Sequence, residues 1–160
     1  MDAKPLRRVL VANRGEIAVR VIRACHQAGA EAVAVYSEAD AGAVHVRKAD
    51  EAIPIGPPQP AKSYLNIDAL IAAAGESGAD SVHPGYGFLS ENASFAQAVA
   101  DAGLTFVGPS AAAIAAMGDK AMARELAREA GVPLVPGSGL VTDDDEAVAA
   151  AGRVGYPVLV

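Results

Sequence analysis

The sequence has 160 residues, of which 52% are hydrophobic and 20% charged, and its formal net charge is −6. These values predict a folded protein with its own hydrophobic core and the length of about one domain. The negative charge, 4% aromatic content and absence of tryptophan argue against a nucleic-acid partner, which needs clustered cations and stacking rings. No apolar run approaches the roughly 18 residues of a membrane span. The N-terminus lacks a hydrophobic segment of the signal-peptide type, so a cytoplasmic protein with no membrane partner is expected.

The chain opens with a predicted strand, a tight turn and a helix. Residues 8–12 form a short apolar run, and residues 13–15 (Asn-Arg-Gly) follow it as the turn. Hydrophobic residues then recur at helical spacing, which predicts one buried helix face. These residues are Ile17, Val21, Ile22 and Cys25. Residues 31–37 form a second apolar run, so the opening is a βαβ unit with parallel strands.

The first turn contains a single glycine, Gly15. A dinucleotide-binding turn has a Gly-x-Gly-x-x-Gly series that lets a pyrophosphate lie against the helix N-terminus. A structural βαβ unit is therefore favoured over a nucleotide site at this turn. Polar residues share another face of the helix, and their stripe is either a solvated face or a surface that selects a partner by paired charges. They are Glu16, Arg20, Arg23 and Gln27.

Strands and helices continue to alternate after the βαβ unit. The pattern predicts a short helix at 41–49, a strand at 51–55 and a helix at 67–77. Asn66 is suited to the N-cap of the last of these helices. His45 has no cysteine or second histidine at metal-ligand spacing, so it is expected on a solvated helix face and not at a metal site.

A predicted strand at 80–83 leads into a glycine-punctuated loop, residues 83–92 (HPGYGFLSEN). Gly85 and Gly87 permit backbone conformations barred to other residues, so Tyr86 between them is presented with little shielding. Loops that follow strands in α/β proteins carry function because the sheet fixes their position. The loop is therefore the candidate functional site. The alternative interpretation is a structural turn covered by a tyrosine.

The remaining predicted elements lie after the loop. They are helices at 92–102, 110–117 and 119–130, and a strand at 104–107. The acidic run at 143–146 opens a further helix, where carboxylates in the first turn interact favourably with the helix dipole. This interpretation is favoured over a metal site. Residues 155–160 begin another predicted strand, so the chain is expected to be part of something longer.

Five short segments stand in the order found in biotin carboxylases. They are NRGEIA (13–18), KSYLN (62–66), HPGYGFLSEN (83–92), FVGP (106–109) and MGDK (117–120). The whole chain resembles the N-terminal part of that family. The resemblance implies an α/β fold, with a Rossmann-like parallel sheet flanked by helices as the pre-ATP-grasp domain at 1–110. Linker helices and the truncated beginning of an ATP-grasp domain would follow at 111–160.

The resemblance also implies an ATP-dependent ligase that carboxylates biotin on its carrier from ATP and bicarbonate, through carboxyphosphate, with Mg²⁺ bridging the phosphates. It assigns Lys120 to the ATP phosphates, and Tyr86 and Gly87 to the biotin pocket. No catalytic residue and no metal ligand is expected within this chain. ATP, Mg²⁺ and biotin would be bound mainly beyond Val160, so residues 1–160 alone are expected to be inactive.

The partners implied by the resemblance are a biotin carrier protein or domain and a carboxyltransferase, as in acyl-CoA carboxylases of fatty acid biosynthesis or pyruvate carboxylases. The helix with Arg20, Arg23 and Gln27 is expected to contribute to a homodimer interface. Some members of the family have a glutamate at the position of Gln27, and that glutamate can pair with an arginine across the dimer axis. Gln27 has no carboxylate, so this salt bridge is in doubt here. The alternatives are a dimerisation or scaffold module, or another pre-ATP-grasp enzyme. A carbamoyl-phosphate synthetase or purine-pathway carboxylase shares the architecture but not the HPGYGFLSEN loop.

Overall fold

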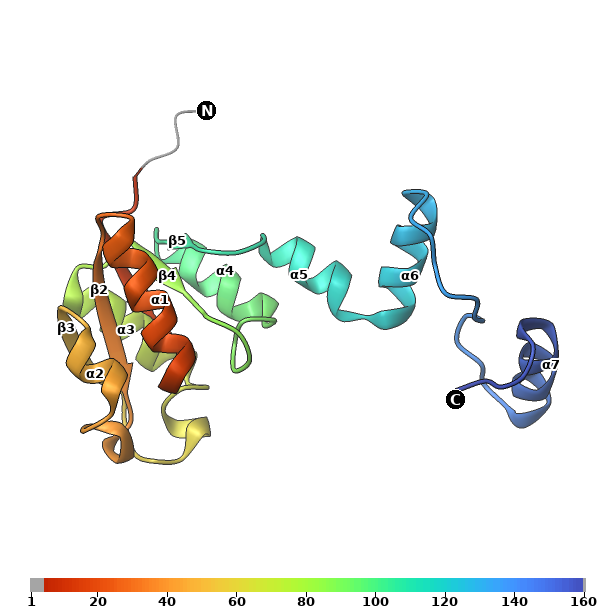
Figure 1. Ribbon diagram of the computed structural model, residues 1–160, viewed down its shortest axis with the longest axis horizontal. Helices are drawn as coiled ribbons and strands as arrows, with labels where there is room; N and C mark the ends of the chain where they lie inside the picture. The colour runs from red at the N-terminus through yellow and green to blue at the C-terminus, as the bar shows by residue number, and fades with distance from the viewer. Residues whose placement is uncertain (1–4, 160) are drawn as a thin grey trace. The chain divides into compact units, whose positions relative to one another are not determined.

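The computed structural model describes residues 5–159, apart from the side chain of Lys120. The chain divides into two compact units, Met1–Ala115 and Ala116–Val160. The first unit is built on a five-stranded parallel sheet with the strand order β3-β2-β1-β4-β5 (Figure 1). The strands are β1 (Arg8–Val11), β2 (Glu31–Tyr36), β3 (Glu51–Pro54), β4 (Ser81–His83) and β5 (Thr105–Phe106). The predicted α/β class with a Rossmann-like parallel sheet is therefore confirmed.

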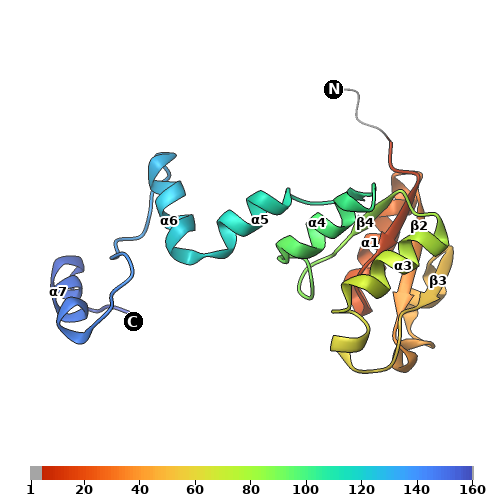
Figure 2. The same ribbon diagram turned by 180° about the vertical axis from the view of Figure 1, so that it is seen from behind.

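Helices connect the strands and cover both faces of the sheet. Those of the first unit are α1 (Gly15–Gln27), α2 (Val44–Lys48), α3 (Ile67–Ser77) and α4 (Ala93–Asp101), with 3₁₀ turns η1 (Glu38–Asp40) and η2 (Pro60–Lys62). The helix α5 (Ala111–Gly118) crosses the boundary between the units, and the second unit holds α6 (Lys120–Glu129) and α7 (Asp144–Val154). Figure 1 views the sheet from the side of α1 and α2, and Figure 2 from the side of α3. No helix within the described residues is long and apolar enough to cross a membrane.

The central strand β1 divides the core of the first unit in two. Val9 and Val11 lie in a buried cluster with the apolar face of α1. Leu10, which is 0% exposed, lies in the other cluster, with residues of α3 and α4. A strand buried on both faces is typical of parallel sheets covered by helices. Complete burial of a leucine side chain contributes about 1.5–3 kcal/mol, so β1 is held firmly, and with it the turn that follows.

Side-chain caps and a glycine set the ends of α3 and the start of α7. The side chain of Asn66 accepts a hydrogen bond from the backbone N–H of Ala69 and begins α3. Gly78 ends that helix in the left-handed conformation, with φ of 63°, which costs glycine little. In the second unit, Asp143 accepts a hydrogen bond from the N–H of Glu146 at the start of α7. The acidic run therefore caps a helix, as predicted.

Two predictions about local structure are wrong. His45 lies in the core and not on a solvated face, because α2 packs against both α1 and β2 and covers it. Its Nε2 lies 3.2 Å from the carbonyl oxygen of Val35. The strand predicted at 155–160 does not form over residues 155–159. A strand needs a hydrogen-bonded neighbour, and the described residues of the second unit contain no strand with which residues 155–159 could pair.

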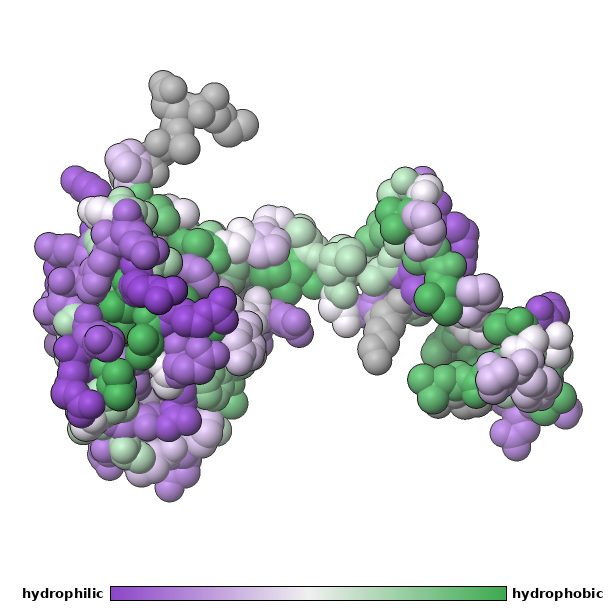
Figure 3. Space-filling model, viewed as in Figure 1, coloured by the Kyte–Doolittle hydropathy of each residue, from purple (hydrophilic) through white to green (hydrophobic). Residues whose placement is uncertain are grey.

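The surface of the first unit is mostly polar over α1 and α2. Figure 3 shows hydrophilic side chains gathered on this face, with a narrow hydrophobic band between them. The exposed polar residues of α1 include Arg20, Arg23 and Gln27. The second unit, by contrast, exposes large apolar side chains, among them Leu140 and Leu159.

Candidate functional site

The candidate site lies where the order of strands in the sheet reverses. From β1 the chain runs to β2 and then β3 on one side, and afterwards returns to place β4 on the other side of β1. The loops that leave the carboxyl ends of β1 and β4 therefore meet at one edge of the sheet. The backbone N–H of Ala12 donates to the carbonyl of His83 at 2.9 Å and joins the two strand ends. In open α/β sheets, ligands bind in the crevice at this switch point.

The turn after β1 holds the loop after β4 through one side chain, Asn13. Its Nδ2 donates to the carbonyl oxygens of Pro84 at 2.8 Å and of Tyr86 at 2.9 Å. Its Oδ1 accepts a hydrogen bond from the backbone N–H of Arg14 at 2.9 Å. Asn13 is 2% exposed, so these bonds are made with little competition from water.

The two glycines of the loop have different surroundings, although φ is +68° at both. A Cβ atom on Gly85 would lie 2.7 Å from Nδ2 of Asn13, whereas one on Gly87 would meet nothing within 4 Å. Gly85 therefore allows the backbone to pack on Asn13, and Gly87 leaves open space beside Tyr86. Phe88 also has a positive φ, of 44°, which is unusual for a residue with a side chain.

Tyr86 is presented as the sequence predicted, with 64% of its surface exposed. It lines two hollows of the first unit. One, of about 360 Å³, lies over the first turn and is also lined by Gly87. The other, of about 400 Å³, runs along α1 and is lined as well by Arg20, Arg23 and Gln27. Tyr86, but not Gly87, thus borders the same hollow as the residues predicted for an interface.

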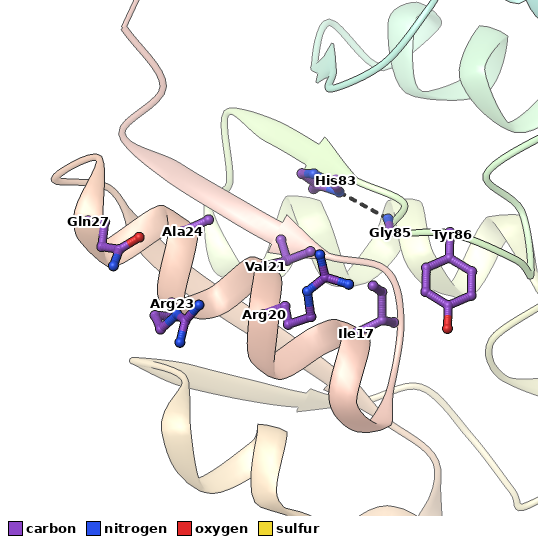
Figure 4. Close-up of a pocket in the computed structure, with 9 residues that line it drawn as sticks. All are labelled: Ile17, Arg20, Val21, Arg23, Ala24, Gln27, His83, Gly85 and Tyr86. Atoms are coloured by element: carbon purple, nitrogen blue, oxygen red, sulfur yellow. Dashed lines mark hydrogen bonds between the residues drawn. The ribbon is translucent and has the colours of Figure 1, made fainter.

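Figure 4 shows how the α1 hollow is arranged. Tyr86 lies beside Ile17 at the start of the helix, and Gln27 lies at the far end. His83 lines the hollow too, and its Nδ1 accepts a hydrogen bond from the N–H of Gly85 at 3.0 Å (Figure 4). Burial lowers the pKa of His83. The neutral ring can accept this bond through Nδ1, whereas an imidazolium cannot.

A second group of side chains supports the loop at Phe88. The ring of Phe88 stacks on that of Tyr64, with centroids 5.3 Å apart and an interplanar angle of 20°. Tyr64 is 2% exposed, and its hydroxyl donates to Oδ2 of Asp40 at 2.7 Å. Arg14 binds the same carboxylate with two hydrogen bonds, of 2.6 and 2.5 Å. The turn after β1 therefore supports the loop both directly and through this chain of contacts.

The charges in this second group are matched. The hydrogen bond with Arg14 is the main cause that lowers the pKa of Asp40 to about 2, and the Tyr64 hydroxyl adds to it. The hydrogen bond with Asp40 in turn raises the pKa of Arg14. Burial raises the pKa of Tyr64. Asp40 is thus ionised and Tyr64 protonated near neutral pH. The group orients the loop and contains no free base or nucleophile.

Asn13, Asp40 and Tyr64 were not identified as site residues from the sequence. The signal in the sequence was that the segments NRGEIA and KSYLN occur in the same chain as the HPGYGFLSEN loop and precede it in that order. In the structure, residues of the first two segments support the loop. Lys120, predicted to contact ATP phosphates, is the first residue of α6. Its side chain lies outside the described part of the chain, so that role stays a prediction.

Comparisons with known proteins show the family of this chain. The family described as "Biotin carboxylase, N-terminal domain" matches residues 5–114. This chain belongs to the biotin carboxylase family. The ATP-binding domain of the carbamoyl-phosphate synthase L chain matches residues 119–160. The alternative of a carbamoyl-phosphate synthetase is not supported for the whole chain, because the site loop falls in the biotin carboxylase match.

Individual biotin carboxylases are similar to nearly the whole chain. Biotin carboxylase 1 of Bacillus subtilis is 54% identical over 156 residues, which cover 97% of this chain and 35% of that protein. Among solved structures, the biotin carboxylase domain dimer of Hydrogenobacter thermophilus 2-oxoglutarate carboxylase, in complex with MgADP, ADP and bicarbonate, has a TM-score of 0.88. It is 49% identical and covers 97% of this chain and 34% of that one. A Campylobacter jejuni biotin carboxylase–β,γ-ATP complex has a TM-score of 0.89 at 45% identity, over 95% of this chain and 34% of that one. The chain therefore spans about a third of the length of these relatives.

Proposed function

We propose that this chain is the N-terminal portion of an ATP-dependent biotin carboxylase. The reaction would carboxylate biotin on its carrier, using ATP and bicarbonate through carboxyphosphate. The observation that carries the proposal is the Tyr86 loop, held at the switch point of the sheet by the NRG turn, in a chain of this family. The Hydrogenobacter thermophilus domain, which binds MgADP and bicarbonate, supports the same nucleotide and substrate here.

Tyr86 and Gly87 are proposed to line the biotin pocket. The exposed ring of Tyr86 offers a flat apolar surface on which the bicyclic ring of biotin can pack, and its hydroxyl remains free to contact water or ligand. Gly87 has no side chain, and a Cβ there would meet no atom within 4 Å. Ligand can therefore approach the backbone at this position.

Residues 1–110 are proposed as the pre-ATP-grasp domain, and 111–160 as linker helices and the beginning of the ATP-grasp domain. Lys120 in the second segment is proposed to contact the ATP phosphates. Among residues 5–159, no group of three or more His, Cys, Asp or Glu side chains is placed to hold a metal ion. We assign Mg²⁺, most contacts to ATP and the reacting groups to the other two thirds of a full-length enzyme.

The α1 stripe is proposed as part of a homodimer interface. Arg20, Arg23 and Gln27 are exposed on one face of α1, and the Hydrogenobacter thermophilus relative is described as a dimer. Gln27 would take part through its amide, not as a charge. The remaining partners proposed are a biotin carrier protein or domain and a carboxyltransferase.

The proposal is tested in the full-length enzyme with free biotin as substrate. Tyr86→Ala is expected to raise the KM for biotin by about tenfold, the effect of losing roughly 1.4 kcal/mol of binding, while the KM for ATP stays unchanged. Val44→Ala is the control, because Val44 is an apolar side chain that is 49% exposed on α2, away from the loop. An unchanged KM for biotin in Tyr86→Ala would overturn the assignment. Residues 1–160 alone are expected to show no biotin-dependent ATP hydrolysis in the same assay.

A further inference from the structure

We propose that Asn13 is a positioning residue that fixes the Tyr86 ring for biotin binding. The inference rests on the proposed function, in which Tyr86 lines the biotin pocket. Asn13 also lines the hollow over the first turn, and in this inference it acts through the loop and not by direct contact with biotin. Three observations support it: the hydrogen bonds of Asn13, the orientation of its amide, and the close contact with Gly85.

The first observation is that Asn13 binds the loop on both sides of Gly85. The two hydrogens of its amide point to the carbonyls of Pro84 and Tyr86, at 2.8 and 2.9 Å. Within the part of the chain that the structure describes, this amide is the hydrogen-bond partner of Tyr86, and no other is found. The Asn13 amide therefore determines where the peptide that carries the ring lies.

The second observation is that the orientation of the amide is fixed. Oδ1 faces a donor, the N–H of Arg14, while Nδ2 faces two acceptors. A flipped amide would place its oxygen against two carbonyl oxygens and its hydrogens against an N–H, with every contact repulsive. An aspartate at this position could keep the bond from Arg14, but it would direct a carboxylate oxygen at both loop carbonyls.

The third observation is the close packing between Asn13 and the loop backbone. A Cβ built on Gly85 would lie 2.7, 3.0 and 3.1 Å from Nδ2, Cγ and Cβ of Asn13. The side chain of Asn13 thus forms the surface on which this peptide lies. Asn13 itself follows the buried residues 9–12 and is 2% exposed. Its position is accordingly set by the core of the sheet and not by solvent.

Other contacts hold the residues on either side of Tyr86 when Asn13 is changed. His83 accepts a hydrogen bond from Gly85, and Phe88 stacks on buried Tyr64. Loss of the Asn13 amide is therefore expected to release the centre of the loop without unfolding the sheet. For this reason we expect the KM for biotin to change and the KM for ATP to stay the same.

The test compares Asn13→Asp with wild type in the full-length enzyme, with free biotin as the substrate. The KM for biotin is expected to rise by at least about tenfold, since displacement of a positioned group by 1 Å can cost up to a hundredfold. The KM for ATP is expected to stay the same. Hydrogen–deuterium exchange of a peptide spanning 84–88, in which the N–H of Gly85 donates to His83, is expected to accelerate by about tenfold. The loop opens more often once the two Asn13 bonds to its carbonyls are lost, each of which contributes about 0.5–1.5 kcal/mol.

Asn66→Asp is the matched control, because Asn66 uses its side chain as an acceptor for the N–H of Ala69 and an aspartate keeps that bond. Asn66→Asp is expected to leave both the KM for biotin and the exchange of the 84–88 peptide unchanged. Asn13→Ser keeps one hydrogen-bond donor. Its KM for biotin and its exchange at 84–88 are expected to lie between those of Asn13→Asp and wild type. This milder variant also provides the measurement if Asn13→Asp does not fold.

The outcomes separate the inference from the proposed function. Unchanged exchange at 84–88 would overturn the inference whatever the kinetics. Faster exchange with an unchanged KM for biotin would also overturn it if Tyr86→Ala does raise that KM. If Tyr86→Ala leaves the KM unchanged as well, the assignment of Tyr86 to biotin fails, while the hold of Asn13 on the loop stands.

Discussion

Replacement of Asp40 by asparagine tests whether charge holds together the group behind Phe88. The carboxylate of Asp40 accepts two hydrogen bonds from Arg14 and one from Tyr64, and its pKa is lowered from 3.8 to about 2. A difference of nearly two pKa units corresponds to about 2 kcal/mol of stability at about 1.4 kcal/mol per unit. The side chain of Arg14 is 48% exposed, and solvent screening reduces the expected value to about 1–2 kcal/mol.

The sign of the pH dependence follows from the direction of the shift. The pKa of Asp40 is lower in the folded protein than in the unfolded chain. The stability that its carboxylate contributes is therefore complete above the unfolded pKa and is lost as pH falls toward 2. Asp40→Asn is therefore expected to lower the free energy of unfolding by about 1–2 kcal/mol at pH 7 and by about half as much at pH 3. The measurement is urea unfolding of the 160-residue chain at both pH values, followed by far-ultraviolet circular dichroism.

Asp68→Asn provides the matched control for this experiment. Asp68 is exposed in the first turn of α3, where a carboxylate contributes about 0.3–1 kcal/mol through the helix dipole. The same loss of stability at pH 7 and pH 3 in Asp40→Asn would refute the reasoning, because an uncharged partner would then serve as well as the carboxylate.

Two further predictions concern the loop glycines and the α1 stripe. Gly85→Ala is expected to cost about 2–5 kcal/mol in urea unfolding, because overpacking against Asn13 adds about 1–3 kcal/mol to the positive-φ penalty. Gly87→Ala is expected to cost about 1–2 kcal/mol from φ alone, and equal losses at the two glycines would contradict the close packing at Gly85. Arg23→Glu in the full-length enzyme is expected to shift sedimentation from dimer toward monomer through charge reversal at the interface. An unchanged dimer would leave the stripe as a solvated face.

Local signals in the sequence predicted the elements that depend on neighbouring residues. The helix α3 is an example, since its cap, Asn66, and its terminating glycine, Gly78, stand at the ends of a periodic apolar pattern. The alternation of apolar runs and helices likewise predicted a parallel sheet. The exposure of Tyr86 followed from the glycine on each side of it.

Features that depend on distant residues could not be predicted in this way. His45 is buried because α2 packs back over β2 and α1, which its own neighbours in the sequence do not indicate. Tyr64 and Asp40 are 24 residues apart, so their hydrogen bond follows from the fold alone. The strand predicted at 155–160 was apolar enough, but strand formation requires a partner that local hydrophobicity does not reveal.

The hydrogen bonds of Asn13 also have a consequence for the order in which the protein folds. They join residues that are 71 and 73 positions apart in the chain. Contacts of such long sequence separation form late, because the intervening chain must first be ordered. During synthesis, β1, β2 and β3 can pair before β4 has left the ribosome, whereas the Tyr86 loop reaches its final conformation only once β4 lies beside β1. The nascent chain can thus have a folded half-sheet while the Tyr86 loop is still unformed.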